Sequence, residues 1–226
     1  MTDRQRVADE PGIVLHSRPY RETSLIFSVL TLHHGRVGVV AKGARGSRRG
    51  RSIQPFCRVL LGWSGRSGLV TLTGYELQKQ YWFQGNQLAC AFYLAELTTR
   101  LLDEREAHPR LFAGLEWALQ RIHESPALVL RSFEKLLLEE LGYGLDFQRD
   151  LNGLPLQAEG RYRLLVDRGF VAAEDGHEGR VLLQIGQGNF VDPEVRRAAR
   201  TLFREALAAH LGPKPLQSRR LLIGGG

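Results

Sequence analysis

The spacing of apolar residues changes period near Lys79, and this change limits the folds that the chain can adopt. Before Lys79, short apolar runs rich in β-branched residues alternate with turn residues, which is the pattern of β-strands. Gly62 and Gly74 fall inside two of these runs, and we interpret them as bulges that let a small sheet curl. The predicted strands cover residues 12–17, 24–32, 36–42, 54–63 and 68–77.

After Lys79 the apolar period becomes helical. Asn86 is a plausible N-cap for a first helix that runs to about Asp103. This helix is apolar on nearly all sides, so we expect it to be buried at the seam between the strands and the later helices. Further helices are predicted over residues 109–123, 126–141, from Asp192 to before Gly212, and 216–222; residues 143–190 are otherwise irregular, with a hairpin of 161–166 and 170–173.

These elements predict an α+β fold in two domains. Five curled strands in about 70 residues indicate a β-barrel of the oligonucleotide-binding (OB) type, although an SH3-like barrel would give nearly the same pattern. We assign residues 1–80 to this barrel. Residues 81–226 then form a mainly α-helical C-terminal domain that carries the small β-hairpin.

The excess of positive over negative charge is confined to the first third of the chain. The 226 residues carry a net charge of +7, but residues 1–80 alone hold 13 Lys and Arg against 5 Asp and Glu. A confined positive field attracts polyanions, of which nucleic acid is the commonest large one in a cell. An acidic membrane surface is the weaker alternative, because no amphipathic helix accompanies the charge.

The segment from residue 42 to 51 concentrates this charge. It contains no acid and no large apolar side chain, so it cannot contribute to a core; its cations are Lys42, Arg45, Arg48, Arg49 and Arg51. Cations in such a loop neutralise phosphates and release counterions, and glycines let the backbone follow an irregular path. A solvated linker is the alternative interpretation. We predict that this loop binds nucleic acid.

The strand that enters the loop alternates so that Arg36, Gly38, Val40 and Lys42 share one face. Two cations and a glycine on one face suit an approaching phosphate backbone. Several neighbouring side chains extend this surface in our interpretation: Arg18, Arg21 and Arg66 in predicted loops, with Tyr20 and Tyr75 as candidates for stacking on bases. Trp63 alternates in phase with apolar neighbours and is predicted to be core.

Signals for an enzyme are weak. The pair His33-His34 lacks a third ligand at metal spacing, and no nucleophile elbow, phosphate-binding loop or dinucleotide fingerprint occurs. The two cysteines, Cys57 and Cys90, belong to no Cys-x-x-Cys pair and are predicted to be reduced core thiols. We expect no catalysis, no cofactor, no signal peptide and no membrane helix, which makes the cytoplasm the default location.

A second group of cations occurs late in the chain. Arg196, Arg200 and Arg204 recur every four residues opposite an apolar stripe, and Lys214, Arg219 and Arg220 follow. A solvated helix face is as plausible as a second DNA contact or a surface for an acidic peptide.

The sequence resembles the RecO family of bacterial DNA repair proteins. The matching segments span nearly the whole chain in the family's order: residues 14–25, 34–37, 40–45, 54–56, 139–145 and 212–219. The resemblance implies a non-enzymatic recombination mediator that binds single- and double-stranded DNA, anneals complementary strands and is associated with the nucleoid. It also implies as partners the single-stranded DNA-binding protein through its acidic C-terminal tail, RecR, and indirectly the recombinase RecA. An RNA-binding barrel is the runner-up.

Two further expectations follow from the resemblance. Many family members carry a four-cysteine zinc site after the segment Leu141-Gly-Tyr-Gly144, but residues 143–190 contain no cysteine, so we expect no metal. For the acidic tail we expect an apolar groove rimmed by cations on the helix 126–141. The side chains proposed for that groove are Arg131, Phe133, Lys135 and Leu136.

Overall fold

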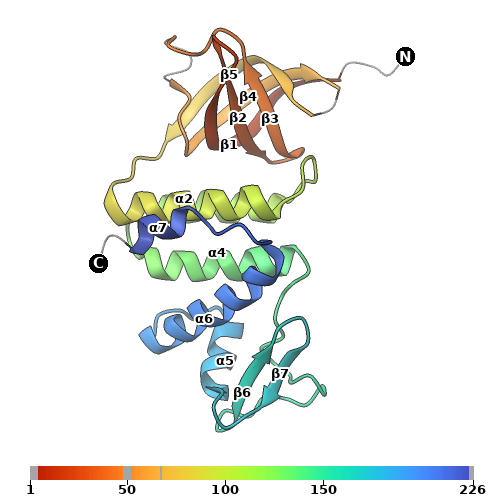
Figure 1. The fold of residues 1–226 in the computed structure, drawn as a ribbon, viewed down its shortest axis with the longest axis vertical. Coiled ribbons are helices and arrows are strands. Elements are labelled where there is room, and N and C mark those ends of the chain that lie inside the picture. The colour runs from red at the N-terminus through yellow and green to blue at the C-terminus, as the bar shows by residue number, and fades with distance from the viewer. Residues whose placement is uncertain (1–4, 48–51, 67, 224–226) are drawn as a thin grey trace. The chain divides into compact units, whose positions relative to one another are not determined.

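The computed structural model describes residues 5–47, 52–66 and 68–223. The chain forms two compact units, one comprising Met1–His123 together with Leu216–Gly226 and the other comprising Glu124–Pro215 (Figure 1). The boundary expected after residue 80 marks the place where strands give way to helices, and as a domain boundary it remains a prediction.

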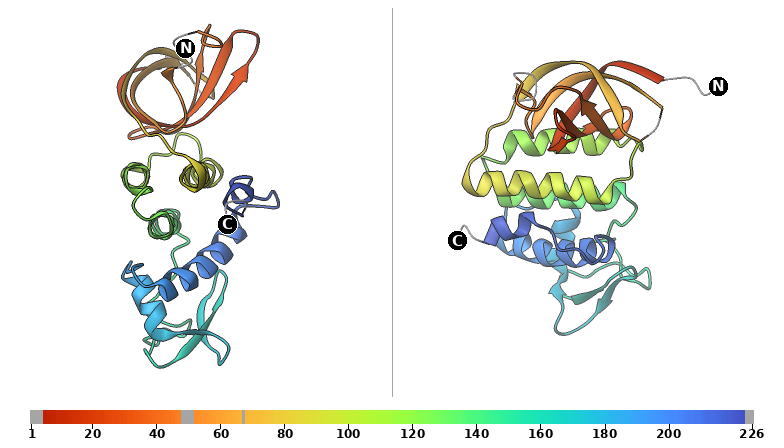
Figure 2. Two further views of the ribbon diagram at one scale, coloured as in Figure 1. Left: turned by 90° about the vertical axis from the view of Figure 1, so that its left-hand side faces the viewer. Right: turned by 45° about the horizontal axis from the view of Figure 1, so that its top comes forward.

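Five strands of the first unit form a closed barrel in the order β1-β2-β3-β5-β4 (Figure 2, left). They are β1 (Gln5–Tyr20), β2 (Ser24–Thr31), β3 (Gly35–Ala41), β4 (Cys57–Gly65) and β5 (Val70–Gln80). The pairing of β3 with β5 is parallel, whereas the other pairs are antiparallel. The α+β class and the OB-type barrel predicted from the sequence are therefore confirmed.

Strand β1 is much longer than the predicted 12–17 because it serves two neighbours. Its first part, from Gln5 to Ile13, pairs with β4, and its last part, from Gly12 to Tyr20, pairs with β2. The polar ends of the strand lack apolar alternation, so periodicity detected only its middle. Arg18, predicted in a loop, lies in this strand with its side chain exposed.

The predicted bulge in β4 and β5 is present. Gly62 pairs with Gly74 but Trp63 pairs with Leu72, so Thr73 is the extra residue. An extra residue reverses the alternation of side chains, and Leu72 and Tyr75 consequently both pack against the barrel core. Trp63 is 1% exposed, which confirms its predicted place in that core.

Both cysteines are buried in this unit and neither of these two described residues forms a disulfide, as predicted. Burial raises the pKa of the Cys57 thiol, and a hydrogen bond from the Gln54 backbone opposes this only in part. A thiol held in its protonated form is a poor nucleophile.

The helices of the first unit are α2 (Gly85–Leu101), α3 (Pro109–Arg121) and α7 (Ser218–Ile223). The predicted N-cap at Asn86 is wrong: the helix already begins at Gly85, and Gln84, with extended backbone, occupies the cap position. Helix α2 is buried along much of its length and packs on β1 and α7, as its apolar surface predicted. It connects directly to the barrel through Phe92, whose ring lies 5.2 Å from that of Phe56.

Glu96 of α2 holds α7 in place. Its carboxylate accepts hydrogen bonds from the backbone N–H groups of Gln217 and Ser218, at 2.9 and 2.8 Å, and from the Ser218 hydroxyl at 2.6 Å. Burial alone would raise the pKa of Glu96, but these donors and nearby Arg100 outweigh it, so the pKa is lowered. A side chain more than a hundred residues away therefore caps the final helix.

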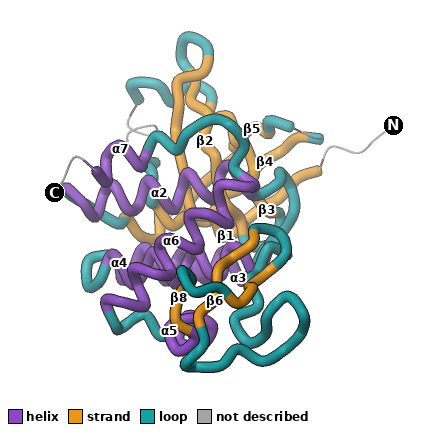
Figure 3. Tube along the Cα trace, turned by 60° about the horizontal axis from the view of Figure 1, so that its bottom comes forward, coloured by secondary structure: helices purple, strands orange, loops and turns teal. Residues whose placement is uncertain are grey.

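The second unit contains α4 (Pro126–Glu140), α5 (Gly179–Gly186), α6 (Pro193–His210) and a sheet of order β7-β6-β8 (Figure 3). Strands β6 (Arg161–Leu165) and β7 (Gly169–Ala172) confirm the predicted hairpin. The expectation that residues 143–190 are otherwise irregular is wrong for β8 (His177–Glu178) and for α5, which is too short to establish a clear period. Asp192 caps α6 as predicted, accepting from the Glu194 N–H at 2.7 Å.

Within the described residues, no helix combines the length and the apolar character that crossing a membrane requires.

Candidate nucleic-acid interface

A groove of about 820 Å³ opens on the barrel where three segments meet. The turn between β1 and β2, the end of β3 and the beginning of β5 supply its walls. The lining residues are Tyr20, Arg21, Glu22, Thr23, Ser24, Val40, Lys42, Arg45, Leu69 and Thr71. We call this surface the barrel groove. It brings together four of the predicted site residues: Tyr20, Arg21, Lys42 and Arg45.

Two tight turns and one backbone hydrogen bond shape the barrel groove. Arg21 and Gly43 both have positive φ, of 53° and 65°, which turns the chain sharply after β1 and after β3. The Arg45 N–H donates to the Thr23 carbonyl at 2.8 Å and so ties the two turns together. The predicted loop therefore begins as an ordered part of the barrel.

The cations of the barrel groove outnumber its acids, since Arg21, Lys42 and Arg45 share the lining with Glu22 alone. The Arg45 guanidinium donates to the backbone carbonyls of Arg21 and Glu22, at 3.5 and 3.4 Å, and the Arg21 guanidinium lies 5.2 Å from the centre of the Tyr20 ring. Within the described residues, Arg21, Lys42 and Arg45 form no ion pair with a carboxylate. Their charge is therefore available to an anionic ligand.

The alternation predicted for β3 is confirmed. Val37, Val39 and Ala41 are buried, while Arg36, Gly38 and Val40 are only half-buried on the other face. The two ends of that face differ, however. Lys42 reaches the barrel groove, whereas Arg36 pairs with Glu104 at 3.3 Å, donates to the Leu102 carbonyl and is 18% exposed.

Sequence reasoning missed Leu69 and Thr71. A Cβ placed on Gly38 would lie 2.7 Å from Leu69 Cδ2, so this side chain covers the glycine. Leu69 reaches it because Val39 and Val40 pair with Val70 and Thr71 in the parallel ladder. No local sequence signal reports a pairing between segments 31 residues apart.

The remaining predicted contacts fall elsewhere. Arg66 is exposed in the connection after β4 and, like Arg18, does not line the barrel groove. Tyr75, a stacking candidate, instead packs on the barrel core, and its hydroxyl lies 2.5 Å from that of Ser52. Arg48, Arg49 and Arg51 lie outside the described residues.

His33 and His34 have a structural role. The backbone N–H and the ring Nδ1 of His33 lie 2.7 and 3.0 Å from the carboxylate of Glu10, and the ring of His34 packs edge-on against Trp63 at 5.3 Å. Across the described ranges, no group of three or more His, Cys, Asp or Glu side chains is placed to hold a metal ion.

The side chains proposed for an acidic-tail groove on α4 are largely engaged within the second unit. Phe133 is 1% exposed, and Arg131 is buried with its guanidinium 2.7 Å from the Glu134 carboxylate. Lys135 pairs with Glu139, and Leu136 is half-buried. Two members of the set, Arg131 and Phe133, are thus closed to a ligand in this conformation.

The cations late in the chain also differ in exposure and in the unit to which they belong. The apolar stripe of α6 is buried and Arg200 and Arg204 are exposed, as predicted, but Arg196 donates to the carbonyls of Phe190 and Val191. Lys214 belongs to the second unit, whereas Arg219 and Arg220 lie on α7 of the first unit.

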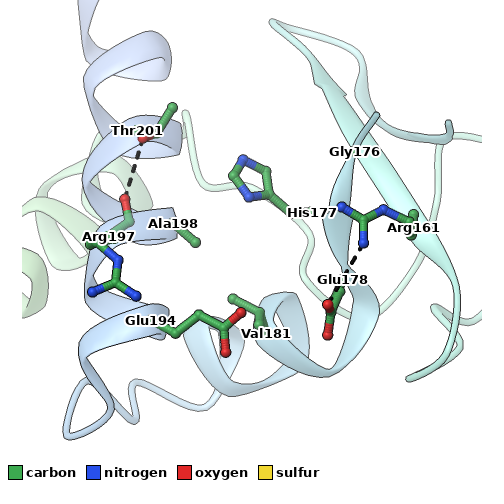
Figure 4. A pocket seen from close by; sticks show the side chains of 9 residues that line it. All are labelled: Arg161, Gly176, His177, Glu178, Val181, Glu194, Arg197, Ala198 and Thr201. Atoms are coloured by element: carbon green, nitrogen blue, oxygen red, sulfur yellow. Dashed lines mark hydrogen bonds and ion pairs between the residues drawn. The ribbon is translucent and has the colours of Figure 1, made fainter. Parts of the chain in front are cut away.

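A smaller pocket of about 330 Å³ lies between α6 and the strands of the second unit (Figure 4). The His177 ring points into it, and Arg161, Arg197, Glu178 and Glu194 surround it. Burial, reinforced by the charge of Arg161, lowers the pKa of His177. Because cations and acids are balanced here, the pocket lacks the uncompensated charge of the barrel groove.

The fold and the barrel groove define an OB-fold protein with a groove of net positive charge. Two family models match the chain. "Recombination protein O N terminal" matches residues 6–81 and "Recombination protein O C terminal" matches residues 83–220. The chain therefore belongs to the RecO family of DNA repair and recombination proteins.

Curated relatives extend over the same length. The DNA repair protein RecO of Nitrosospira multiformis is 41% identical, covering 97% of this chain and 96% of its own. That of Cellvibrio japonicus is 38% identical over 97% and 98%, and that of Nitrosococcus oceani is 43% identical over 96% and 93%.

Proposed function

We propose that this protein is a non-enzymatic mediator of recombinational repair that binds single- and double-stranded DNA through the barrel groove. In this role it anneals complementary strands and, with RecR, helps to load recombinase onto DNA coated by single-stranded DNA-binding protein. The observation that carries the proposal is the cluster of Arg21, Lys42 and Arg45, which form no ion pair with a carboxylate of the described residues.

The chemistry of the barrel groove fits annealing. Cations neutralise phosphates without reading bases, so they bind any sequence and reduce the repulsion between two approaching strands. Tyr20 adds one aromatic face, held beside Arg21, on which a base can stack. Annealing breaks no covalent bond, and the barrel groove accordingly needs no nucleophile or general base.

The partners in this proposal are the acidic tail of the single-stranded DNA-binding protein, RecR and, indirectly, RecA. For the tail we keep the surface of α4 around Lys135 and Leu136, the two members of the predicted set that are not fully buried. Arg131 and Phe133 would join this surface only if α4 shifted on binding. Because the proposed ligand is the chromosome, we place the protein in the cytoplasm at the nucleoid.

The test is the salt dependence of single-strand binding. Arg21→Ala, Lys42→Ala and Arg45→Ala combined should lower the slope of log affinity against log salt by about 2, at roughly 0.7 per lost phosphate contact. The matched control removes three arginines that are ion-paired on the second unit: Arg161, Arg163 and Arg180. An unchanged slope in the groove variant would exclude the barrel groove from the DNA site.

An RNA-binding module is the alternative, because contacts to phosphates distinguish the two sugars poorly. Competition between DNA and RNA oligonucleotides of matched sequence decides between them, with annealing of complementary strands as the readout. Preference for RNA, without acceleration of DNA annealing, would contradict the repair assignment at this site.

A further inference from the structure

A surface with two exposed tryptophans lies on the first unit, away from the barrel groove. Trp82 is 79% exposed and Trp117 is 36% exposed, which is unusual for the largest apolar side chain. Trp82 lies in the connection between β5 and α2, and Trp117 lies on α3. We call Trp82, Trp117 and their neighbours Lys79 and Arg121 the tryptophan surface.

The chain holds Trp82 outward by fixing the residues on either side of it. Tyr81 is buried, its N–H donates to the Phe56 carbonyl at 3.3 Å, and its ring stacks with that of Phe83. Phe83 in turn packs on Phe56, with ring centres 5.6 Å apart. Because both neighbours are anchored, Trp82 projects from a fixed backbone, and its exposure is not that of a free loop.

One hydrogen bond connects this segment to α3. Gln120 Nε2 donates to the Tyr81 hydroxyl at 3.4 Å, and Trp117 lies one helical turn before Gln120 on the same face. Arg121 lies over the Trp117 ring at 5.9 Å, and Lys79 lies over the Tyr81 ring at 4.8 Å. Tyr81 and Trp117 are thus each accompanied by a cation.

The charge of this surface identifies the chemistry of its ligand. Residues 78–84 and 117–123 contain Lys79 and Arg121, and acids flank them at Glu76, Glu116 and Glu124. The acid just before Trp117, Glu116, pairs with Arg58 at 3.0 Å. Exposed aromatic faces bind the bases of an unpaired strand, and adjacent cations bind its phosphates, which is the combination found in single-strand binding sites.

We propose that the tryptophan surface is a second binding site for single-stranded nucleic acid, with Trp82 and Trp117 stacking on bases and Lys79 and Arg121 contacting phosphates. This inference rests on the proposed DNA-binding function and adds a site to it. Thr71 of the barrel groove and Lys79 lie eight residues apart on β5, which places the two sites about 25 Å apart at a rise of roughly 3.3 Å per residue. One strand that contacts both sites would be held extended along the barrel.

Tryptophan fluorescence offers a direct test, since a base stacked on an indole quenches its emission. Oligothymidylate should quench the wild-type protein. Trp82→Ala and Trp117→Ala should each weaken binding roughly tenfold, and the double variant should show no quenching because the remaining Trp63 is buried. Trp82→Phe keeps an aromatic face and should retain most of the affinity.

The outcomes separate the two proposals. Full affinity in both alanine variants would overturn the tryptophan surface, and loss of a protein partner in the same variants would assign it to protein binding instead. If Arg21→Ala, Lys42→Ala and Arg45→Ala leave the affinity unchanged while Trp82→Ala lowers it, the barrel groove fails and the tryptophan surface stands. No binding of oligothymidylate by the wild type would overturn both.

Discussion

The cations of the barrel and those of the second unit differ in what surrounds them. In the barrel groove, Arg45 contacts backbone carbonyls and Arg21 an aromatic ring. In the second unit four arginines face carboxylates, in the pairs Arg131–Glu134, Arg161–Glu178, Arg163–Asp175 and Arg180–Glu194. Arginine is abundant in both regions, but these four arginines of the second unit are ion-paired, whereas Arg21 and Arg45 pair with no carboxylate of the described residues.

This difference teaches that the environment of a charge matters more than its number. When a guanidinium is ion-paired, an incoming phosphate must compete with the carboxylate for it. Arg36 is an example within the barrel. Its guanidinium is paired with Glu104, which lies 68 residues away in sequence, so a count of nearby charges does not reveal the pair. We therefore expect the ion-paired cations of the second unit to affect stability and the cations of the barrel groove to affect binding.

The largest effect is expected at the buried pair of the second unit. Arg131→Ala would leave the Glu134 carboxylate, 2% exposed, without its cation and should lower the free energy of unfolding by about 3–5 kcal/mol. Urea denaturation followed by circular dichroism measures this. Replacing both residues by Met should recover most of the loss, and a single variant as stable as the wild type would contradict the role assigned to the pair.

A smaller loss is expected in the first unit, where an acid caps a helix and does not neutralise an arginine. Glu96→Gln removes the charge that accepts from Gln217 and Ser218 and should cost about 2 kcal/mol at neutral pH. The lowered pKa of Glu96 sets the pH dependence: its contribution is complete above the ordinary carboxyl pKa and is lost as the pH falls through the lowered value. The two proteins should therefore converge in acid, and a difference independent of pH would refute this account.

Local pattern predicted the architecture well because strands, hairpin and helices follow from the periodicity of nearby residues. The bulge at Thr73 shows the limit of prediction from local pattern. The alternation of β5 alone places Tyr75 on the outer face, but its pairing with β4 turns Tyr75 toward the core. The short helix α5 escaped prediction for a different reason. Its eight residues are too few to display a helical period.

Only part of the barrel groove could be predicted from the sequence. Lys42 and Arg45 lie in one continuous basic segment, so composition detected them. Leu69 and Thr71 join the barrel groove only through the parallel pairing of β3 with β5, and the Glu96 cap on α7 spans 122 residues at Ser218. Such contacts depend on tertiary packing, which no short window of sequence encodes.

A single cation of the barrel groove should change binding without changing stability. Arg45→Ala should lower the salt slope of single-strand binding by about 0.7 while the free energy of unfolding stays within roughly 0.5 kcal/mol of the wild type. Fluorescence anisotropy at several salt concentrations, with urea denaturation in parallel, measures both. A loss of stability above that range would mean that the contacts of Arg45 with the turn after β1 are structural.

The smallest effect is expected at an exposed pair of the second unit. Arg163 and Asp175 lie 3.3 Å apart with side chains 57% and 71% exposed, so water screens their attraction. Asp175→Asn should change the free energy of unfolding by less than about 1 kcal/mol. It should also leave single-strand binding unchanged, because unpairing one arginine does not create a groove. If this variant bound DNA more tightly, uncompensated charge alone would suffice for binding, and the shape of the barrel groove would lose its special role.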